Sequence, residues 1–184
     1  MLLSVYAYGQ PVLKKVGKDI DADYPDLEKL IADMWETMYH AHGVGLAAPQ
    51  IGRSIRIFVV DTIQMMEEGK EAEGIKMVFI NAHKIEETGE EWAYEEGCLS
   101  IPDVRGEVER PENITLRWVN EKFEPQEATF TGLNARVIQH EYDHIDGKLF
   151  TEYLKPIKKR MIRRKLDNIK KGKTKADYKM KFVN

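Results

Sequence analysis

Residues 131–147 carry the pattern that most restricts how this chain can fold. Leu133 and Val137 are followed by His140 and His144, at offsets of four, three and four residues. Residues at this spacing share one face of an α-helix, so the pattern predicts a helix whose apolar stripe ends in two histidines. A threonine before it and a glycine after it are suitable start and stop signals. The rest of the fold must cover this face.

Residues 140–144 read His-Glu-Tyr-Asp-His, an HExxH sequence. Residues four apart lie one above the other on a helix, so the imidazoles of His140 and His144 can bind one metal ion. Glu141 is turned by about 100° from His140 on a helix of 3.6 residues per turn, and it can handle the proton of a water without binding the ion. The alternative is a pair of core histidines that are hydrogen-bonded to the backbone.

Cys98 is the upstream candidate for a third ligand. It follows Glu-Glu-Gly at the end of an expected strand, where a metal would stabilise its thiolate. The residues after His144 lack the HExxHxxGxxH extension through which many zinc endopeptidases supply their third ligand. The alternative is that Cys98 is a small apolar core residue. Because the chain has one cysteine, an intrachain disulfide is excluded, which suits a reducing cytosol.

Residues 43–52, Gly-Val-Gly-Leu-Ala-Ala-Pro-Gln-Ile-Gly, form a third unusual segment. Its glycines match neither a phosphate-binding loop nor a dinucleotide fingerprint. One interpretation is a structural turn between a helix and a strand. The other is a segment that passes so close to a ligand that side chains are excluded at Gly43 and Gly45, with Gln50 directed inward as a neutral hydrogen-bond donor.

The remaining patterns predict an α+β fold, with small, mostly antiparallel sheets around the central HExxH helix. An N-terminal amphipathic helix is expected from Pro25 to His42, and a basic C-terminal helix near Pro156, with Ile162, Leu166 and Ile169 on one face. A charged, exposed loop is expected at residues 65–74. Short strands are expected at residues 55–60, 77–81, 92–95, 114–119 and 127–130.

Charge is distributed unevenly along the chain. The 184 residues have a net charge of −3, but residues 155–184 hold 13 Lys or Arg and two acidic residues, so this segment is +11 and residues 1–154 are −14. The length predicts a single domain, in which residues 1–154 form the main part and the basic helix and tail of residues 155–184 are attached to it. The tail is expected either to bind a polyanion or to be solvated and disordered. No membrane span or leader is evident, so a cytoplasmic protein without a membrane partner is expected.

Taken together, the segments GVGLAAPQIG, EGCLS and QHEYDH, in this order and at these separations, resemble the three signature motifs of the peptide deformylases. The similarity covers roughly residues 1–155. It implies a metal-dependent hydrolase that removes the formyl group from the N-terminal formylmethionine of nascent peptides and releases formate. The alternatives are an HExxH endopeptidase and a basic nucleic-acid-binding module with a structural metal.

The resemblance also implies the catalytic groups. One divalent metal ion, natively Fe²⁺ with Zn²⁺, Ni²⁺ or Co²⁺ as replacements, would be held by Cys98, His140 and His144. Glu141 would take the proton of the attacking water and pass it to the departing amine. Negative charge on the formyl oxygen would be stabilised by Gln50 and by the backbone N–H of Leu99.

By the same resemblance, the peptide would bind as an added strand along the main chain near Val44 and Gly97, and Gly45 would leave room for the formyl group. The apolar pocket for the methionine side chain is expected to include Val44, Leu133 and Val137.

Two arginines, Arg105 and Arg136, are also expected near the substrate. Arg105 corresponds to a polar position that contacts the peptide downstream of the methionine. Arg136 stands where the family is often apolar, so it is expected either at a polar rim of the pocket or facing solvent. The basic tail is similar to the helical tails of bacterial deformylases, which implies ribosomal RNA as its polyanionic partner.

Overall fold

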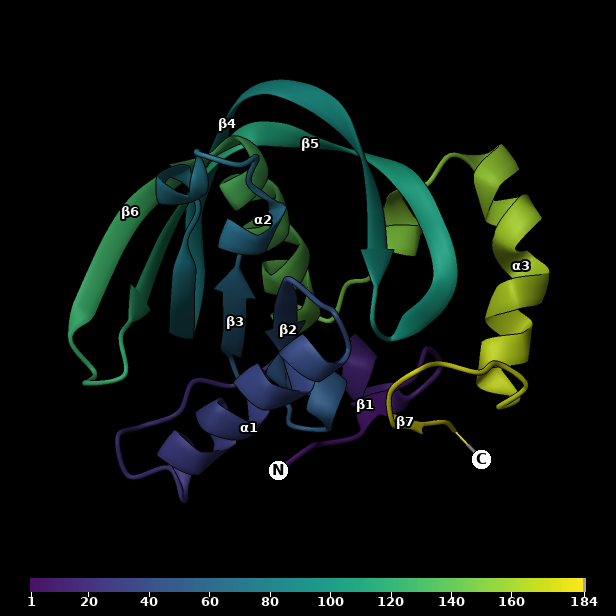
Figure 1. The fold of residues 1–184 in the computed structure, drawn as a ribbon, viewed down its shortest axis with the longest axis horizontal. Helices are drawn as coiled ribbons and strands as arrows, with labels where there is room; N and C mark the ends of the chain where they lie inside the picture. Colours follow the sequence, from purple (N-terminus) through teal and green to yellow (C-terminus); the bar gives the residue numbers. More distant parts are fainter. Residues whose placement is uncertain (184) are drawn as a thin grey trace.

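The computed structural model describes residues 1–183, and most of them surround one central helix (Figure 1). Within this part of the chain, five strands form one antiparallel sheet in the order β2-β3-β4-β5-β6, and two strands form a small parallel sheet, β1-β7. The strands of the larger sheet are β2 Gly45–Ala47, β3 Ile57–Asp61, β4 Lys76–Cys98, β5 Ile101–Val119 and β6 Pro125–Thr131. A mixed fold with antiparallel strands is thus confirmed, whereas the expectation of several small sheets of short strands is wrong.

The long pair β4–β5 explains this error. The predicted strands at residues 77–81 and 92–95 are two parts of β4, which continues through residues 83–91 although all of these are exposed. Backbone pairing with β5 holds this stretch in the strand, and no apolar alternation marks it in the sequence. Four register shifts along the pair bend it, and it curves over the central helix in Figure 1.

The central helix is α2, Gly132–Ile145, which packs against β2, β3 and β5. Its residues Ala135 and Ile138 are fully buried in a core that also contains Phe58 and Leu116. Burying apolar side chains of this size contributes about 1.5–3 kcal/mol for each of the larger ones, so the sheet and helix stabilise each other.

The N-terminal helix α1, Leu27–His40, covers the sheet beside β2 and β3. Its buried apolar residues follow helical spacing and are Leu30, Ile31, Met34 and Met38. It begins after Asp26, so Pro25 precedes the helix instead of lying in its first turn. The segment between β3 and β4 contains two short 3₁₀ turns, Ile63–Met65 and Glu71–Glu73, and residues 67–73 are exposed, as expected of a loop.

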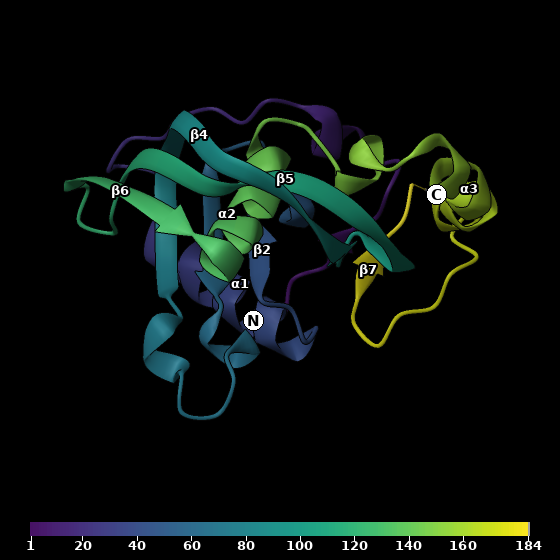
Figure 2. The same ribbon diagram turned by 90° about the horizontal axis from the view of Figure 1, so that it is seen from above.

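The C-terminal residues are folded, so a solvated and disordered tail is ruled out for residues 155–183. Helix α3, Pro156–Lys170, buries Ile162 and Ile169 in a second core cluster beneath β5. The chain then returns, and β7, Met180–Lys181, pairs in parallel with β1, Val5–Tyr6. Figure 2 shows this return from α3 to β7, beside the tip of the β4–β5 pair. No helix of residues 1–183 is long and apolar enough to cross a membrane.

Candidate metal centre

Three side chains with metal-binding atoms meet at one cavity. Among the described residues, the sulfur of Cys98 and one nitrogen each of His140 and His144 form the one group of this kind, with the three atoms within 4.8 Å of one another. Nε2 of His144 lies 3.4 Å from the Cys98 sulfur. Cys98 ends β4, and the histidines lie one turn apart on α2, so the end of a strand and the face of a helix bring them together.

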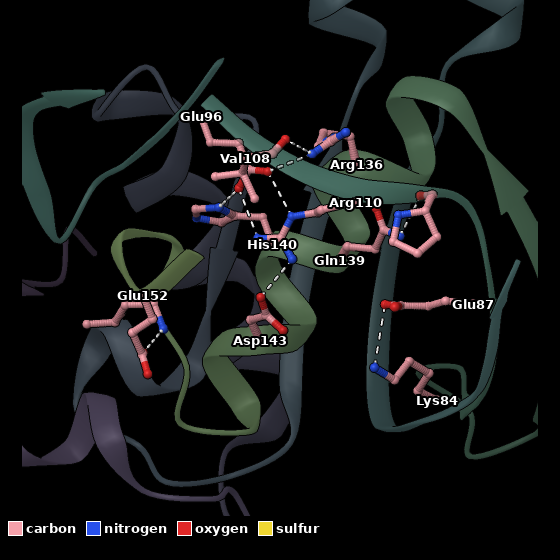
Figure 3. Close-up of polar contacts among 12 residues, drawn as sticks. Lys84, Glu87, Glu96, Val108, Arg110, Arg136, Gln139, His140, Asp143 and Glu152 are labelled. Carbon is pink, nitrogen blue, oxygen red and sulfur yellow. Dashed lines mark hydrogen bonds and ion pairs between the residues drawn. The ribbon is translucent and has the colours of Figure 1, made fainter. Parts of the chain in front are cut away.

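Glu96 orients His140 from behind. Nδ1 of His140 donates a hydrogen bond of 2.8 Å to Oε1 of Glu96, which leaves Nε2 as the atom that can bind an ion. Arg110 donates to both carboxylate oxygens of Glu96, at 2.8 and 3.0 Å, and also to Asp143 at 2.8 Å (Figure 3). Burial alone would raise the pKa of Glu96, but the hydrogen bonds from His140 and Arg110 outweigh it and lower the pKa to about 2. Glu96 is therefore a carboxylate, which fixes the tautomer and orientation of the imidazole.

Glu141 borders the same cavity and is buried against the backbone of β2. Burial raises the pKa of Glu141 to about 7, near the pH at which a general base works best. Its Oε2 has no hydrogen-bond partner among residues 1–183. A Cβ at Gly45 would lie 2.6 Å from Oε1 of Glu141, closer than real Cβ contacts. The glycine at position 45 therefore makes room for the Glu141 carboxylate.

Gln50 points toward the sulfur of Cys98. Its Oε1 accepts a hydrogen bond of 3.0 Å from the backbone N–H of Ala47, which turns Nε2 the other way. Nε2 then lies 3.4 Å from the Cys98 sulfur and donates to Oγ of Ser100 at 3.2 Å. Leu99 stands between these two residues in the turn from β4 to β5. A side-chain amide and a backbone N–H are thus held beside the candidate ligands.

The cavity above these groups has a volume of about 630 Å³. The residues predicted to bind substrate that line it are Val44, Gly97, Arg105, Arg136 and Val137. Leu133, which was expected in the methionine pocket, is half-buried on α2 and is not part of this lining among the described residues. Met65, from the segment expected to be a loop, contributes an apolar side chain to the lining instead.

Arg136 is buried, with 1% of its surface exposed, so the interpretation of a solvent-facing arginine is wrong. Its guanidinium donates to Glu96 at 3.2 Å and to the carbonyl oxygen of Val108 at 2.8 Å (Figure 3). It also donates to the carbonyl oxygen of Trp92 at 2.5 Å. It also lies 4.4 Å from the centre of the Trp92 ring. Arg136 therefore lines the cavity with a guanidinium whose two terminal nitrogens are bound to the protein.

The donor atoms at this site fit a divalent metal ion. A thiolate and two imidazoles are ligands for zinc, iron and similar ions, and three protein ligands leave a coordination position open, as a catalytic site requires. Burial and the neighbouring His140 lower the pKa of His144 well below its usual value, so its ring is held in the neutral form that binds metals.

Sequence reasoning missed the groups that surround the ligands. Glu96 lies two residues before Cys98, and this closeness to a candidate ligand was the one sequence feature that could have indicated its role. Arg110 and Asp143 gave no local signal, because Arg110 is 14 residues from Glu96 and 33 residues from Asp143 in the sequence. The cavity is also bordered by residues 175–178 of the tail, which was expected to lie apart from the chemistry.

Known proteins resemble this chain over most of its length. Residues 2–160 match the family described as Polypeptide deformylase. The peptide deformylases of Christiangramia forsetii and Flavobacterium johnsoniae are 56% and 53% identical to it, and each alignment covers 100% of this chain and 97% of the relative. A crystal structure of a peptide deformylase from Legionella pneumophila has a TM-score of 0.81 and 39% identity, covering 93% of this chain and 96% of that one. Agreement of this extent in both sequence and fold means that the chain belongs to the peptide deformylase family, the hydrolases that remove the N-formyl group from formylmethionine at the start of nascent chains.

Proposed function

We propose that deformylation takes place in the cavity described above, and that Cys98, His140 and His144 hold one divalent metal ion there. The observation that carries this proposal is the approach of their three donor atoms to within 4.8 Å of one another, next to Glu141 and Gln50. The position of these groups also supports the division of the chain into two parts. Residues 1–154 hold these groups, and residues 155–184 are an attached basic element of the same domain.

The native ion is Fe²⁺, with Zn²⁺, Ni²⁺ or Co²⁺ able to replace it. A donor set of one thiolate and two imidazoles suits each of these ions, and the family resemblance favours iron. When bound, such an ion supplies Lewis acidity, which polarises a carbonyl and lowers the pKa of water. Metal analysis of protein purified without oxygen tests the assignment to iron.

The protein groups move the proton and stabilise the charge. Water adds to the formyl carbon, the C–N bond breaks, and formate and a free amine are released. A carboxylate oxygen of Glu141 takes the proton of the water and delivers it to the departing nitrogen. Nε2 of Gln50 and the N–H of Leu99 donate hydrogen bonds to the formyl oxygen as it becomes negative.

The substrate binds as an extended strand along the backbone of Val44 and Gly97. The methionine side chain packs against the apolar residues of the cavity wall, Val44, Met65 and Val137, and Leu133 has no direct part in the pocket. Arg105 is exposed at the cavity mouth and contacts the peptide beyond the methionine. Arg136 is a fixed, polar part of the cavity wall, because its guanidinium is bound to Glu96 and to backbone carbonyls.

Replacing Cys98 by serine tests the ligand set. A hard hydroxyl oxygen is a poor substitute for a soft thiolate, so the variant is expected to lose most of its bound metal and with it most of its activity. Metal content by emission spectrometry and formate release from a formyl-methionyl peptide measure the two effects. The thermal unfolding of the two proteins, both stripped of metal, serves as the control for folding. A variant with unchanged metal content and unchanged rate would show that Cys98 is a core residue.

The cytoplasm is the proposed location, and the ribosome is the proposed partner of the basic face of α3. Phosphate contacts release counterions, so association with ribosomes is expected to weaken steeply as salt rises. Changing the exposed Arg160, Arg163 and Arg164 to glutamine should weaken co-sedimentation with ribosomes at low salt. The matched control changes Lys15, Lys18 and Lys122 to glutamine. These lysines are exposed elsewhere on the protein, and their replacement removes the same amount of charge. Equal loss in both variants would exclude a docking role specific to α3.

A further inference from the structure

The segment that follows α3 and ends with β7 returns across the molecule to the candidate metal centre. We call this segment, residues 173–181, the C-terminal strap. At its far end it is anchored by β7, whose pairing with β1 includes Val5 opposite Met180. Gln10 adds a side-chain hydrogen bond of 2.7 Å to the carbonyl oxygen of Phe182. The strap therefore has a fixed path, and its residues 175–178 form part of the cavity lining.

Tyr178 connects the strap to the turn that carries Leu99. Its hydroxyl donates a hydrogen bond of 2.6 Å to the backbone carbonyl oxygen of Leu99. The side chain is half-buried, and its burial and the neighbouring Cys98 raise the pKa of the Tyr178 hydroxyl, so the hydroxyl keeps its proton and acts as a donor at neutral pH. The residue lies beyond residues 2–160, the part that matches the family model, but within the part that aligns with the two bacterial relatives.

The turn of Leu99 and Ser100 is held from three sides. Cys98 pairs with Ile101, so these two residues are the whole connection between β4 and β5. The backbone N–H of Tyr8 donates to the carbonyl oxygen of Ser100 at 2.8 Å, and Gln50 donates to the Ser100 hydroxyl at 3.2 Å. Tyr178 is the group that holds the Leu99 carbonyl. Backbone polar groups near the interior need such partners, and each partner also fixes the orientation of its peptide unit.

We propose that Tyr178 is a positioning residue for deformylation, which fixes the backbone of Leu99 so that the Leu99 N–H points at the formyl oxygen. The inference rests on the proposed role of Leu99 as an oxyanion donor. The N–H of Leu99 lies in the peptide unit before its Cα atom and the carbonyl in the unit after it. Because Cys98 is held in the sheet by its pairing with Ile101, holding the Leu99 carbonyl as well limits the φ and ψ angles of Leu99, and with them the direction of the N–H. A donor stabilises the transition state fully only when it is aimed in advance at the developing charge. The strap thereby makes the end of the chain part of the catalytic arrangement.

The experiment compares Tyr178→Phe with Tyr24→Phe in the full-length, metal-loaded enzyme. Tyr24 is the matched control, because its hydroxyl accepts a hydrogen bond of 3.1 Å from Arg53 outside the cavity lining. Removing the Tyr178 hydroxyl is expected to lower kcat on a short formyl-methionyl peptide about 10-fold, less than the 10²- to 10³-fold loss that follows removal of an oxyanion donor itself. KM, metal content and the unfolding temperature should stay close to the values of the control variant.

A pair of inhibitors separates positioning from a general loosening of the site. A peptide hydroxamate presents an oxygen to the Leu99 N–H, whereas a peptide thiol of the same sequence binds without such an oxygen. Tyr178→Phe should weaken the hydroxamate about as much as it lowers kcat and leave the affinity of the thiol unchanged. Equal weakening of both inhibitors, or an unchanged kcat, would overturn the proposal. Gln50→Ala tests the proposed function separately: if it abolishes turnover while Tyr178→Phe has no effect, the oxyanion site stands and the role of the strap does not.

Discussion

Replacing Glu141 by glutamine is expected to remove nearly all deformylation and to leave the metal content near that of the unchanged enzyme. Glutamine has the size of glutamate but cannot accept and return a proton, and proton transfer by a positioned group contributes about 10²- to 10⁴-fold to a rate. The ligands are untouched, since Glu141 stands beside the cluster and outside it. Burial already raises the pKa of Glu141 to about 7, so the fold accepts an uncharged side chain here. Formate release and emission spectrometry measure the two quantities.

Glu95→Gln is the matched control for this variant. Glu95 borders the same cavity and undergoes the same change of charge, but its side chain is 63% exposed. We expect its turnover to stay within about threefold of the unchanged enzyme, because exposed charges are screened by solvent. Substantial turnover in Glu141→Gln would mean that another group accepts the proton.

Removing the residues after Leu154 is expected to unfold the protein or to lower its stability by several kcal/mol. Ile162 and Ile169 of α3 are 4% and 1% exposed, and they share a core cluster with Val104 and Val108 of β5. Burial of each isoleucine contributes about 1.5–3 kcal/mol, against a total stability of about 5–15 kcal/mol for a typical domain. The truncation also removes β7 and leaves β1 without a partner. Circular dichroism during thermal and urea unfolding measures the loss.

Single substitutions on α3 make this expectation quantitative. Ile162→Ala and Ile169→Ala should each cost about 2–5 kcal/mol, the usual range for emptying a buried isoleucine site. Ile157→Ala is the control on the same helix, because Ile157 is 71% exposed and should change stability by less than about 0.5 kcal/mol. If the three variants are equally stable, α3 is an appendage, and the truncated protein should stay folded and active on small peptides.

The sequence predicted those parts of the site that depend on local spacing. His140 and His144 were found because four residues make about one helical turn, and Cys98 because it ends a strand in a recognisable segment. Arg110 and Asp143 could not be found in this way, because their meeting with Glu96 depends on how β5 packs against α2. For the same reason the sequence left two places open for Arg136, at the pocket or facing solvent, since two of its partners are backbone carbonyls of β4 and β5.

The fold shows the same limit. Helices with one apolar face were located to within a few residues, because periodicity marks them directly. The exposed middle of β4 was missed, since its charged residues are held by hydrogen bonds to β5 and not by burial. The return of the tail was missed because two-residue strands such as β1 and β7 carry too little pattern to be recognised.

The pairing of Val5 with Met180 has a consequence for how the enzyme is made. During synthesis, β1 leaves the ribosome long before β7. The contact between them closes a loop of almost the whole described chain, and contacts between such distant residues form slowly. While its own synthesis continues, the enzyme therefore lacks the strap that supports Leu99. A newly made molecule should therefore acquire its full rate only after β7 has left the ribosome and paired with β1.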